Sequence, residues 1–378
     1  MGSPRLFLLY NRRMTDHPIN RRDFLSVASG GALLAAVPPG KEPASRRSIL
    51  NYNPNMEYRR LGKTGLMVSS VCLGGHWKRV GTVLPGPFKG EGYSEVDFNN
   101  VNDPAFLKNR HDVVSRCIEA GINYVDACAG PEILAYAKVL NGRRDKMYFG
   151  FSWHARESRY TEFRSGEKLI EGLNQGLKEA GLDYVDLWRI SLPMEMISDL
   201  GELAAVERGA VEALEMAKKQ GKARFTGVST HNRVWLKSLI EQYPKQIEAV
   251  LFPYTAATKE LPDDSVFDAI KQHDVGVFGI KPFADNSLFE GDSSPASPHR
   301  EADDRRARLA IRYILGNPAI TAPIPGLINL AQVDNAARAV AERRKLDARE
   351  KAELDALSER MWARLRPGYE WLRDWQAV

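Results

Sequence analysis

Eight short apolar runs alternate with longer helical segments along residues 69–324, and this alternation restricts the possible folds more than any other feature of the sequence. Strands that alternate with helices of about 10–15 residues indicate βαβ units, whose strands run parallel. Eight such units over about 270 residues suit a closed barrel better than an open sheet. The predicted strands are residues 69–75, 122–125, 147–151, 184–190, 224–228, 247–252, 275–280 and 321–324. The predicted helices are residues 105–120, 133–141, 166–180, 207–220, 234–242, 265–273 and 303–315.

A hairpin signal precedes these strands, and a further helical segment follows them. Residues 56–68 alternate polar and apolar side chains around Gly62-Lys63-Thr64-Gly65, which predicts a β-hairpin. From Leu346 onward the chain is helical and charged and then aromatic, which predicts a C-terminal cap packed on the barrel. The predicted fold is therefore α/β: a (β/α)8 TIM barrel over residues 56–343, with an N-terminal hairpin and a C-terminal helical extension over residues 344–378.

The first 40 residues have the pattern of a targeting segment. Arg21-Arg22-Asp23-Phe24-Leu25 precedes an apolar run over residues 27–37, which is too short to span a bilayer. The arginine pair resembles a twin-arginine (Tat) export signal, so residues 1–40 are predicted to engage the Tat export machinery. We expect an exported protein, periplasmic or otherwise extracytoplasmic, with residues 41–55 as a linker. No other segment is apolar enough for a stable membrane span.

The charge and the cysteine content argue against several classes of function. The net charge is +5 and no basic patch with interleaved aromatic residues is present, so no nucleic-acid partner is expected. The three cysteines, Cys72, Cys117 and Cys128, suit no disulfide framework and lack the spacing of a metal site. We therefore expect these cysteines to be buried apolar residues, and we expect no metal ion.

One carboxylate stands where a barrel places its catalytic groups. The predicted strand 122–125 leads directly into Asp126, and a helix is expected to begin near Pro131. In α/β barrels, catalytic residues lie at the carboxyl ends of the parallel strands. The long Gly- and Pro-rich stretch at residues 76–104 is expected to help shape the same pocket, because long loops of this kind are usually functional or mobile.

Several runs, taken in order, resemble the aldo/keto reductase family over residues 56 to about 340. The resemblance implies a (β/α)8 barrel that binds a nicotinamide cofactor, NAD(P)(H), without a Rossmann motif, and no Gly-x-Gly-x-x-Gly follows a predicted strand. The matching runs are residues 56–69, Leu73-Gly74-Gly75-His76-Trp77, Ala120-Gly121-Ile122-Asn123-Tyr124-Val125-Asp126, Gly221-Lys222-Ala223-Arg224-Phe225-Thr226-Gly227-Val228-Ser229, and residues 320–326.

The resemblance also implies four catalytic residues. In the family a Tyr donates the proton, a Lys paired with an Asp lowers the pKa of that Tyr, and a His helps to orient the carbonyl group. Asp126 matches the Asp, but Pro131 stands at the Tyr position. Ser152 stands at the Lys position and Ser191 at the His position, so three of the four residues have changed. Tyr136 is close in sequence, but its place inside a predicted helix suggests a packing or surface residue.

Some cofactor positions of the family are retained. Ser229 matches the family's Ser after the fifth strand, whereas Thr230 replaces the Asn that follows it. Lys281 replaces a Ser and would place a cation near the cofactor pyrophosphate or another anion. Pro325 and Gly326 match the end of the last strand.

Other cofactor positions differ from the family pattern. Leu251 stands in place of a Gln, and Ile280 stands in place of the aromatic residue that stacks on nicotinamide. Residues 327–330 carry no charge to hold a 2′-phosphate, so a preference for NADP is not supported.

Without its lysine, Asp126 needs a different explanation. Either another cation meets it, or it acts alone as an acid or base, or it is retained only as a hydrogen-bonded residue. The candidate cations are Lys78, Arg156, Arg189 and Lys281. Three histidines at predicted strand ends, His76, His154 and His231, either supply new acid or base groups or simply line the pocket.

By this resemblance the chain is expected to be a nicotinamide-dependent oxidoreductase that acts on a carbonyl or a sugar-like alcohol. Two other classes stay open. One is an exported non-redox barrel, either a pseudo-enzyme or a small-molecule binding protein. The other is a lyase or isomerase that uses Asp126 with a new His or Lys.

Overall fold

The computed structural model describes residues 49–86, 88, 96–342 and 345–378. The predicted signal at residues 1–40 and most of the predicted linker lie outside the described residues. In the part of the chain that the structure describes, no helix combines the length and the apolar character needed to cross a membrane.

The chain enters the fold through the predicted hairpin. Strand β1 (Tyr58–Arg60) pairs antiparallel with β2 (Met67–Ser69), and Tyr58 lies opposite Ser69. Leu61, in the connection, is fully buried, and it leaves no room for a side chain at Gly276, whose Cβ would lie 2.5 Å from the leucine Cδ1. The hairpin therefore packs into the barrel interior, which confirms the predicted N-terminal element.

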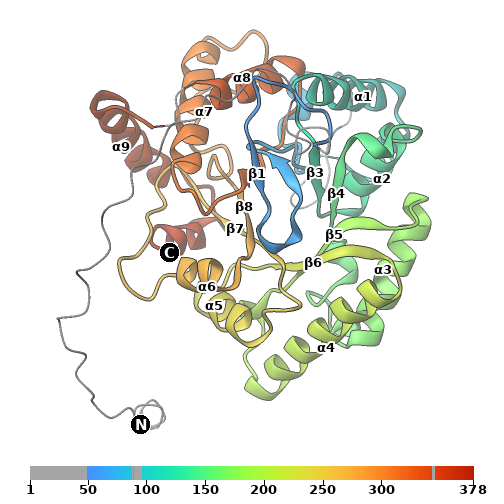
Figure 1. The fold of residues 1–378 in the computed structure, drawn as a ribbon. Helices are drawn as coiled ribbons and strands as arrows, with labels where there is room; N and C mark the ends of the chain where they lie inside the picture. Colours follow the sequence, from blue (N-terminus) through green and yellow to red (C-terminus); the bar gives the residue numbers. More distant parts are fainter. Residues whose placement is uncertain (1–48, 87, 89–95, 343–344) are drawn as a thin grey trace, which may run out of the picture. The chain divides into compact units, whose positions relative to one another are not determined.

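Seven parallel strands follow, and each pairs with its successor in the chain (Figure 1). They alternate with helices, as the sequence pattern predicts. The strands are β3 (Tyr124–Ala127), β4 (Tyr148–Phe151), β5 (Val185–Ser191), β6 (Ala223–Ser229), β7 (Ala249–Pro253), β8 (Gly276–Ile280) and β9 (Ala322–Pro323).

The predicted first strand, residues 69–75, is wrong as a continuous strand. Its beginning belongs to the hairpin, where the Ser70 amide bonds to the Glu57 carbonyl. Only a short stretch around Leu73 remains for the barrel, and it bridges β3 through hydrogen bonds with Tyr124 and Asp126. On its other side, the Cys72 amide donates to Pro323 and the Gly74 amide to Pro325. These bonds join the two edges of the sheet and close the barrel.

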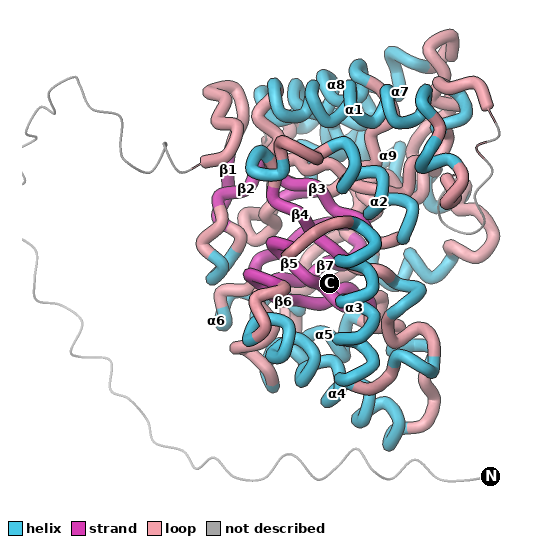
Figure 2. The backbone as a smooth tube through the Cα atoms, turned by 90° about the vertical axis from the view of Figure 1, so that its right-hand side faces the viewer, coloured by secondary structure: helices cyan, strands magenta, loops and turns pink. Residues whose placement is uncertain are grey.

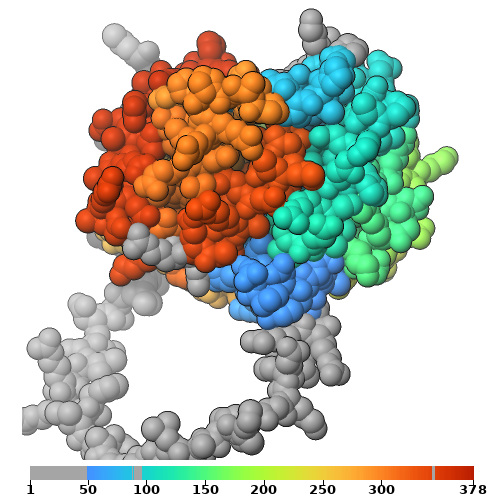
Figure 3. Space-filling model, turned by 90° about the horizontal axis from the view of Figure 1, so that it is seen from above, coloured from blue at the N-terminus to red at the C-terminus, as the bar shows by residue number. Residues whose placement is uncertain are grey.

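Helices surround the strands (Figures 1 and 2). The first helix, α1, lies beside the last one of the barrel, α8, and the cyan to teal and orange to red surfaces meet in Figure 3. The helices are α1 (Pro104–Glu119), α2 (Gly130–Val139), α3 (Gly166–Ala180), α4 (Leu200–Lys219), α5 (Arg233–Gln242), α6 (Val266–His273), α7 (Arg300–Leu315) and α8 (Leu330–Ala341).

Two of these helices begin earlier than predicted. Helix α4 starts at Leu200 because Asp199 caps it, accepting a hydrogen bond of 2.7 Å from the Glu202 amide. Helix α7 starts at Arg300 and not at residue 303. The charged first turn of α7, Arg300-Glu301-Ala302-Asp303, carries little apolar periodicity, so the sequence pattern missed it.

The C-terminal extension consists of α9 (Ala348–Ala363) and a 3-10 helix (Glu370–Trp375). Apolar residues of this extension pack with Leu288 and Leu309 in one buried cluster. Trp375 stacks on Phe252 of β7, with ring centroids 5.4 Å apart. The predicted helical extension is thus confirmed, and it brings Tyr369 to the carboxyl ends of the strands.

Candidate active site at the carboxyl ends of the strands

A cavity with about 1200 Å³ of empty volume opens at the carboxyl ends of the strands. A second cavity, of about 1430 Å³, lies between α7 and the segment that joins β9 to α8. The two cavities share four lining residues, Lys78, Phe283, Asn286 and Gly326. They therefore meet and form one elongated site.

The structure brings together most of the residues singled out in the sequence. Pro131, Ser152 and Thr230 are buried away from the cavity wall. The singled-out residues that line the first cavity are His76, Lys78, Asp126, Cys128, His154, Arg189, Ser191, Ser229, His231, Ile280, Lys281, Pro325 and Gly326.

Asp126 has a cationic partner, and it is Arg189. The Arg189 Nε donates to Asp126 Oδ1 at 3.1 Å, and Nη2 donates to Oδ2. Both side chains are about 5% exposed, so the pair is buried and its charges cancel locally. Of the other candidate cations, Lys78 pairs with Asp285 and Arg156 with Glu179.

The two serines at the family's Lys and His positions converge on one carboxylate. Ser152 Oγ donates to Glu157 Oε2 at 2.7 Å, and the Ser191 amide donates to the same oxygen at 2.7 Å. The Trp153 amide donates to the other oxygen. Burial raises the pKa of Glu157 to about 7, although these hydrogen bonds and the nearby Arg189 oppose the rise.

Pro131 and Tyr136, the two residues that the sequence offered for the family's tyrosine position, do not supply a proton donor to the cavity. Pro131 is buried in the first turn of α2. Tyr136 is also buried, and its hydroxyl donates to the Gly74 carbonyl at 2.6 Å and accepts from Trp77. Burial holds the pKa of Tyr136 well above its usual value, so it serves packing and not proton transfer near neutral pH.

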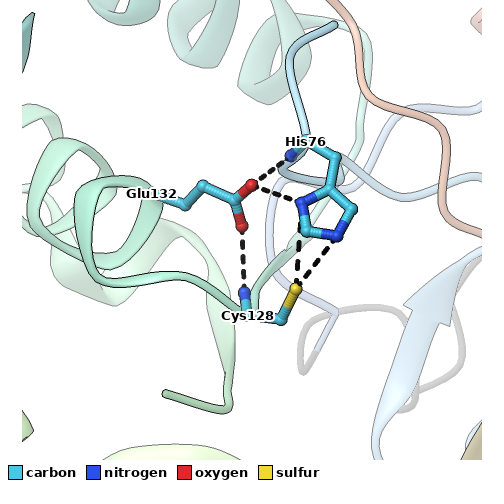
Figure 4. Close-up of side chains that lie close together, drawn as sticks. All are labelled: His76, Cys128 and Glu132. Carbon is cyan, nitrogen blue, oxygen red and sulfur yellow. Dashed lines mark hydrogen bonds and ion pairs between the residues drawn. The ribbon is translucent and has the colours of Figure 1, made fainter. Parts of the chain in front are cut away.

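A third buried carboxylate organises a different corner of the cavity (Figure 4). Glu132 Oε1 accepts hydrogen bonds from the His76 amide and from His76 Nδ1, the latter at 2.7 Å. Its other oxygen accepts from the Cys128 amide at 3.0 Å. The Cys128 thiol lies beside the same imidazole ring, 3.3 Å from Nε2 and 3.8 Å from Nδ1.

The pKa values of His76 and Glu132 depend on each other. Burial alone would lower the pKa of His76, but Cys128 and the Glu132 carboxylate outweigh it and raise the value to about 10. Burial alone would raise the pKa of Glu132, but His76 and the two backbone amides lower it to about 2. The two groups therefore form an ion pair over the neutral pH range.

Cys128 is partly exposed in the cavity, whereas Cys72 and Cys117 are buried. The prediction that the cysteines are buried apolar residues is therefore wrong for Cys128. The reason is that Cys128 follows the last residue of β3 and lies at the rim of the barrel, where side chains face the cavity.

The other cavity histidines are held in the neutral form. Burial, with help from Lys281 and Arg159, lowers the pKa of His231 to about 2, and its ring stacks on Trp371. Burial also lowers the pKa of His154, whose Nδ1 lies 2.5 Å from the Cys128 carbonyl. These two residues line the cavity, and His76 is the charged histidine of the three.

Lys281 is the cavity cation without a carboxylate at ion-pair distance among the described residues. Burial, together with the nearby Lys78, lowers its pKa to about 8. It follows β8 with a positive φ of 54°, a conformation that non-glycine residues seldom adopt and that is often found at functional sites.

The cofactor positions predicted from the sequence divide into two groups. Ser229, Lys281, Pro325 and Gly326 border the first cavity, and Gly326 borders both cavities. Thr230 is buried, and its hydroxyl accepts from the Asn232 amide at 3.1 Å, which uses it in a local turn.

A family model agrees with this arrangement. The model of the aldo/keto reductase family matches residues 98–308, which is more than half of the chain. The chain belongs to the aldo/keto reductase family. This assigns it to a family of oxidoreductases, as the sequence resemblance implied, and the fold class predicted from the sequence is confirmed.

Individual relatives of this family member are distant. The chain is similar to L-galactose dehydrogenase of Arabidopsis thaliana, with 23% identity over 80% of this chain and 95% of that protein. It is also similar to human aldo-keto reductase family 1 member C3, with 29% identity over 35% of this chain and 45% of that protein. The holo form of an aldo-keto reductase from Bacillus halodurans has the same fold, with a TM-score of 0.55, 21% identity, and coverage of 80% of this chain and 96% of that chain.

Two residues of this reductase-family site were missed by the sequence reasoning, namely Glu132 and Glu157. Glu132 follows Cys128 by one helical turn, a spacing that places both near the start of α2. Its partner His76 comes from a distant loop, so the pairing has no local signal. Glu157 lies in a connection of short 3-10 helices, where no periodic pattern marks it.

Proposed function

We propose that this protein is a nicotinamide-dependent oxidoreductase that interconverts a carbonyl group and an alcohol on a sugar-like substrate. The observation that carries this proposal is the elongated site formed by the two joined cavities. A dinucleotide is a long ligand with two different ends, and such a site suits it better than a small ligand alone. Family membership supports the same class of cofactor.

The residues along this site fit the parts of such a cofactor. Ser229 and Ile280 border the end near the Asp126–Arg189 pair, where the nicotinamide would react. Lys281 offers a positive charge for the pyrophosphate. A side chain at Gly326 would collide with the Gly75 carbonyl, at 2.5 Å, so the backbone there is kept bare at the junction of the cavities.

A polar substrate suits the first cavity. Hydroxyl, amide and imidazole groups border it together with a balanced ion pair, and such groups can hydrogen-bond to several substrate hydroxyls. The similarity to L-galactose dehydrogenase favours a sugar-like compound over a steroid or other apolar carbonyl. The lining groups of this kind are Asp126, His154, Arg189, Ser191, Ser229, His231 and Asn286.

The alternative of a lyase or isomerase that uses Asp126 with a new His or Lys is less well supported. Both carboxylate oxygens of Asp126 accept hydrogen bonds from Arg189, and Tyr124 donates to one of them at 3.3 Å. Both oxygens are therefore already engaged within the barrel, and neither is free to approach a substrate as a base. The pseudo-enzyme alternative rests on the changed Tyr, Lys and His positions, and it differs from our proposal in predicting no cofactor.

Calorimetric titration with NADH and NADPH tests the proposal. We expect the protein to bind at least one of them, and Ala307→Trp, which fills the second cavity from α7, to abolish binding. Ala363→Trp is the matched control, because Ala363 is exposed on α9 and borders neither cavity. Absence of binding of both nucleotides to the wild-type protein would contradict the proposal.

We further propose that residues 1–40 direct Tat-dependent export, and the arginine pair at 21–22 supports this. A reporter enzyme fused to residues 1–48 should reach the periplasm, and replacing both arginines by lysine should retain it in the cytoplasm. Export that is unaffected by the lysine pair would contradict this part of the proposal.

A further inference from the structure

We propose that His76, Cys128 and Glu132 form a binding site for a divalent transition-metal ion, with Zn²⁺ as the best match. The three side chains offer one nitrogen, one sulfur and one oxygen, and these ligand atoms all lie within 4.8 Å of one another (Figure 4). They come from separate parts of the chain, the loop after Leu73, the end of β3 and the first turn of α2. The fold therefore brings His76, from a distant loop, to Cys128 and Glu132, which are neighbours in the sequence.

The spacing of the ligand atoms fits one ion. A sulfur and a nitrogen bound to tetrahedral zinc, at about 2.3 Å and 2.1 Å from the metal, stand about 3.6 Å apart. The Cys128 Sγ lies 3.8 Å from His76 Nδ1, the ring nitrogen that also faces Glu132, and this distance is close to that value. Glu132 Oε1 lies 2.7 Å from the same nitrogen, so it would exchange its hydrogen bond for the ion and move outward by about 0.7 Å.

The chemistry of the ligands selects the type of ion. Thiolate and imidazole ligands suit zinc and its neighbours in the first transition row, whereas Mg²⁺ and Ca²⁺ prefer oxygen ligands alone. Three protein ligands of mixed type that leave a position open are the pattern of catalytic zinc sites. All three residues border the first cavity, so the open position would face the bound substrate.

The charge of the site also suits a dication. The Glu132 side chain is 0% exposed, and its only ion-pair partner in the described part of the chain is His76. A thiolate and a carboxylate together carry two negative charges, which a divalent ion neutralises in a buried place. The Cys128 amide, which donates to Glu132 Oε2 at 3.0 Å, would hold the carboxylate in place, as hydrogen bonds to metal ligands do in other metal sites.

Such an ion would supply what the changed catalytic positions lack. Pro131, at the position of the family's tyrosine, has no hydroxyl group to stabilise charge on the substrate oxygen. A Lewis acid in the same cavity stabilises that charge without a proton donor. This role rests on the proposed function, whereas the binding site itself does not.

Cobalt titration of the full chain, freed of metal with a chelator, tests the site directly. We expect one equivalent of Co²⁺ per chain to bind with a sulfur-to-cobalt charge-transfer band and visible bands of tetrahedral intensity, and Zn²⁺ to displace it. Cys128→Ser should abolish the charge-transfer band. Glu132→Gln should weaken cobalt binding at least tenfold, while Cys117→Ala, which alters a buried cysteine of α1, should change neither.

The outcomes separate this proposal from the proposed function. Circular dichroism of each variant checks that the fold is retained, and Cys128→Ser, a near-isosteric change, keeps the test valid if Glu132→Gln does not fold. Absence of a charge-transfer band with excess Co²⁺, or a band that survives in Cys128→Ser, would overturn the metal site. Cobalt binding without NADH or NADPH binding would leave the site in place and contradict the nicotinamide proposal alone.

Discussion

Asp126 and Glu132 are both buried carboxylates at the rim of one barrel, and they are compensated in opposite ways. Asp126 faces the guanidinium of Arg189, which stays charged at any pH the protein meets. Glu132 faces the imidazole of His76, next to the Cys128 thiol, and imidazole and thiol groups can also bind a metal ion. One corner therefore has a fixed partner, and the other has partners that can exchange hydrogen bonds for a metal ion.

The difference shows how the chain departs from its family. The resemblance implies a lysine partner for the family Asp, whereas Asp126 here is paired with Arg189 from β5, which makes the pair a static part of the barrel rim. The adjustable groups have moved across the cavity to the loop after Leu73 and the start of α2. The following predictions test this division, beginning with the largest expected effect.

Removing Arg189 should destabilise the protein most. In Arg189→Met, Asp126 is left buried without a cation, which should cost about 3–5 kcal/mol in the free energy of unfolding. The double variant Asp126→Leu with Arg189→Met should recover much of that loss, because no unpaired charge remains. Urea unfolding measures both, and a single-variant loss below about 1 kcal/mol would contradict a buried, fixed pair.

Glu157 extends the comparison to a third buried carboxylate. It accepts hydrogen bonds but has no cation at ion-pair distance among the described residues. Its pKa is raised from 4.5 to about 7. Between these pH values the folded state binds more protons than the unfolded state, so stability falls as pH rises through the window, by about 3 kcal/mol in total. Glu157→Gln should remove this contribution. Relative to wild type, the variant should gain stability between pH 4.5 and pH 8 in urea unfolding, and a constant difference would contradict the account.

In chelator-treated protein, Glu132→Gln should destabilise the cluster of His76, Cys128 and Glu132, which is the adjustable corner. Losing the charged acceptor of three hydrogen bonds should cost about 1.5–3 kcal/mol. The pKa of Glu132 is about 2 and that of His76 about 10, so the ion pair stabilises fully from pH 4.5 to 6.5 and is lost as pH falls toward 2 or rises through 10. NMR titration of His76 should show its pKa well below 10 in the variant. An unchanged pKa would mean that Glu132 does not control the imidazole.

Lys281 should give the smallest effect, because it is a cation without a carboxylate partner in the described residues. Its pKa of about 8 means that it is charged below pH 8 and loses its charge as pH rises through that value. Lys281→Met should weaken NADH binding about fivefold, or about 1 kcal/mol, at pH 6.5 and hardly at all at pH 9.5. Calorimetry at both pH values measures this, and an equal loss at both would assign Lys281 a structural role.

The sequence predicted the scaffold better than the contacts inside it. Period and turn signals are local, so the hairpin, the alternation of strands and helices, and the place of Asp126 at the end of β3 could be predicted. The strand expected at residues 69–75 failed because the hairpin uses its first part, a competition that no local pattern records. Arg189 was one of four candidate cations, and the choice among them depended on which side chains of β5 face the barrel interior.

The adjustable corner could not be predicted, because its members carry no shared motif. His76 and Glu132 lie 56 residues apart in the chain, and only barrel closure around Leu73 brings their loops together. The absence of metal-type spacing led to the expectation of no metal, yet spacing rules describe ligands on one short segment. Ligands delivered by three separate elements escape them.

Titration of the purified protein with NADH, with excitation of tryptophan, is the most direct test of whether the barrel binds a nicotinamide cofactor. Trp371 lies beside Lys281, whose amine is 5.6 Å from the ring centroid, at the proposed cofactor site. If the barrel binds the cofactor, energy transfer from tryptophan to the reduced nicotinamide should be saturable, with a dissociation constant of about 1 µM to 1 mM. The transfer should be lost in Ala307→Trp. No saturable transfer with NADH or NADPH at millimolar concentration would contradict a nicotinamide-dependent barrel.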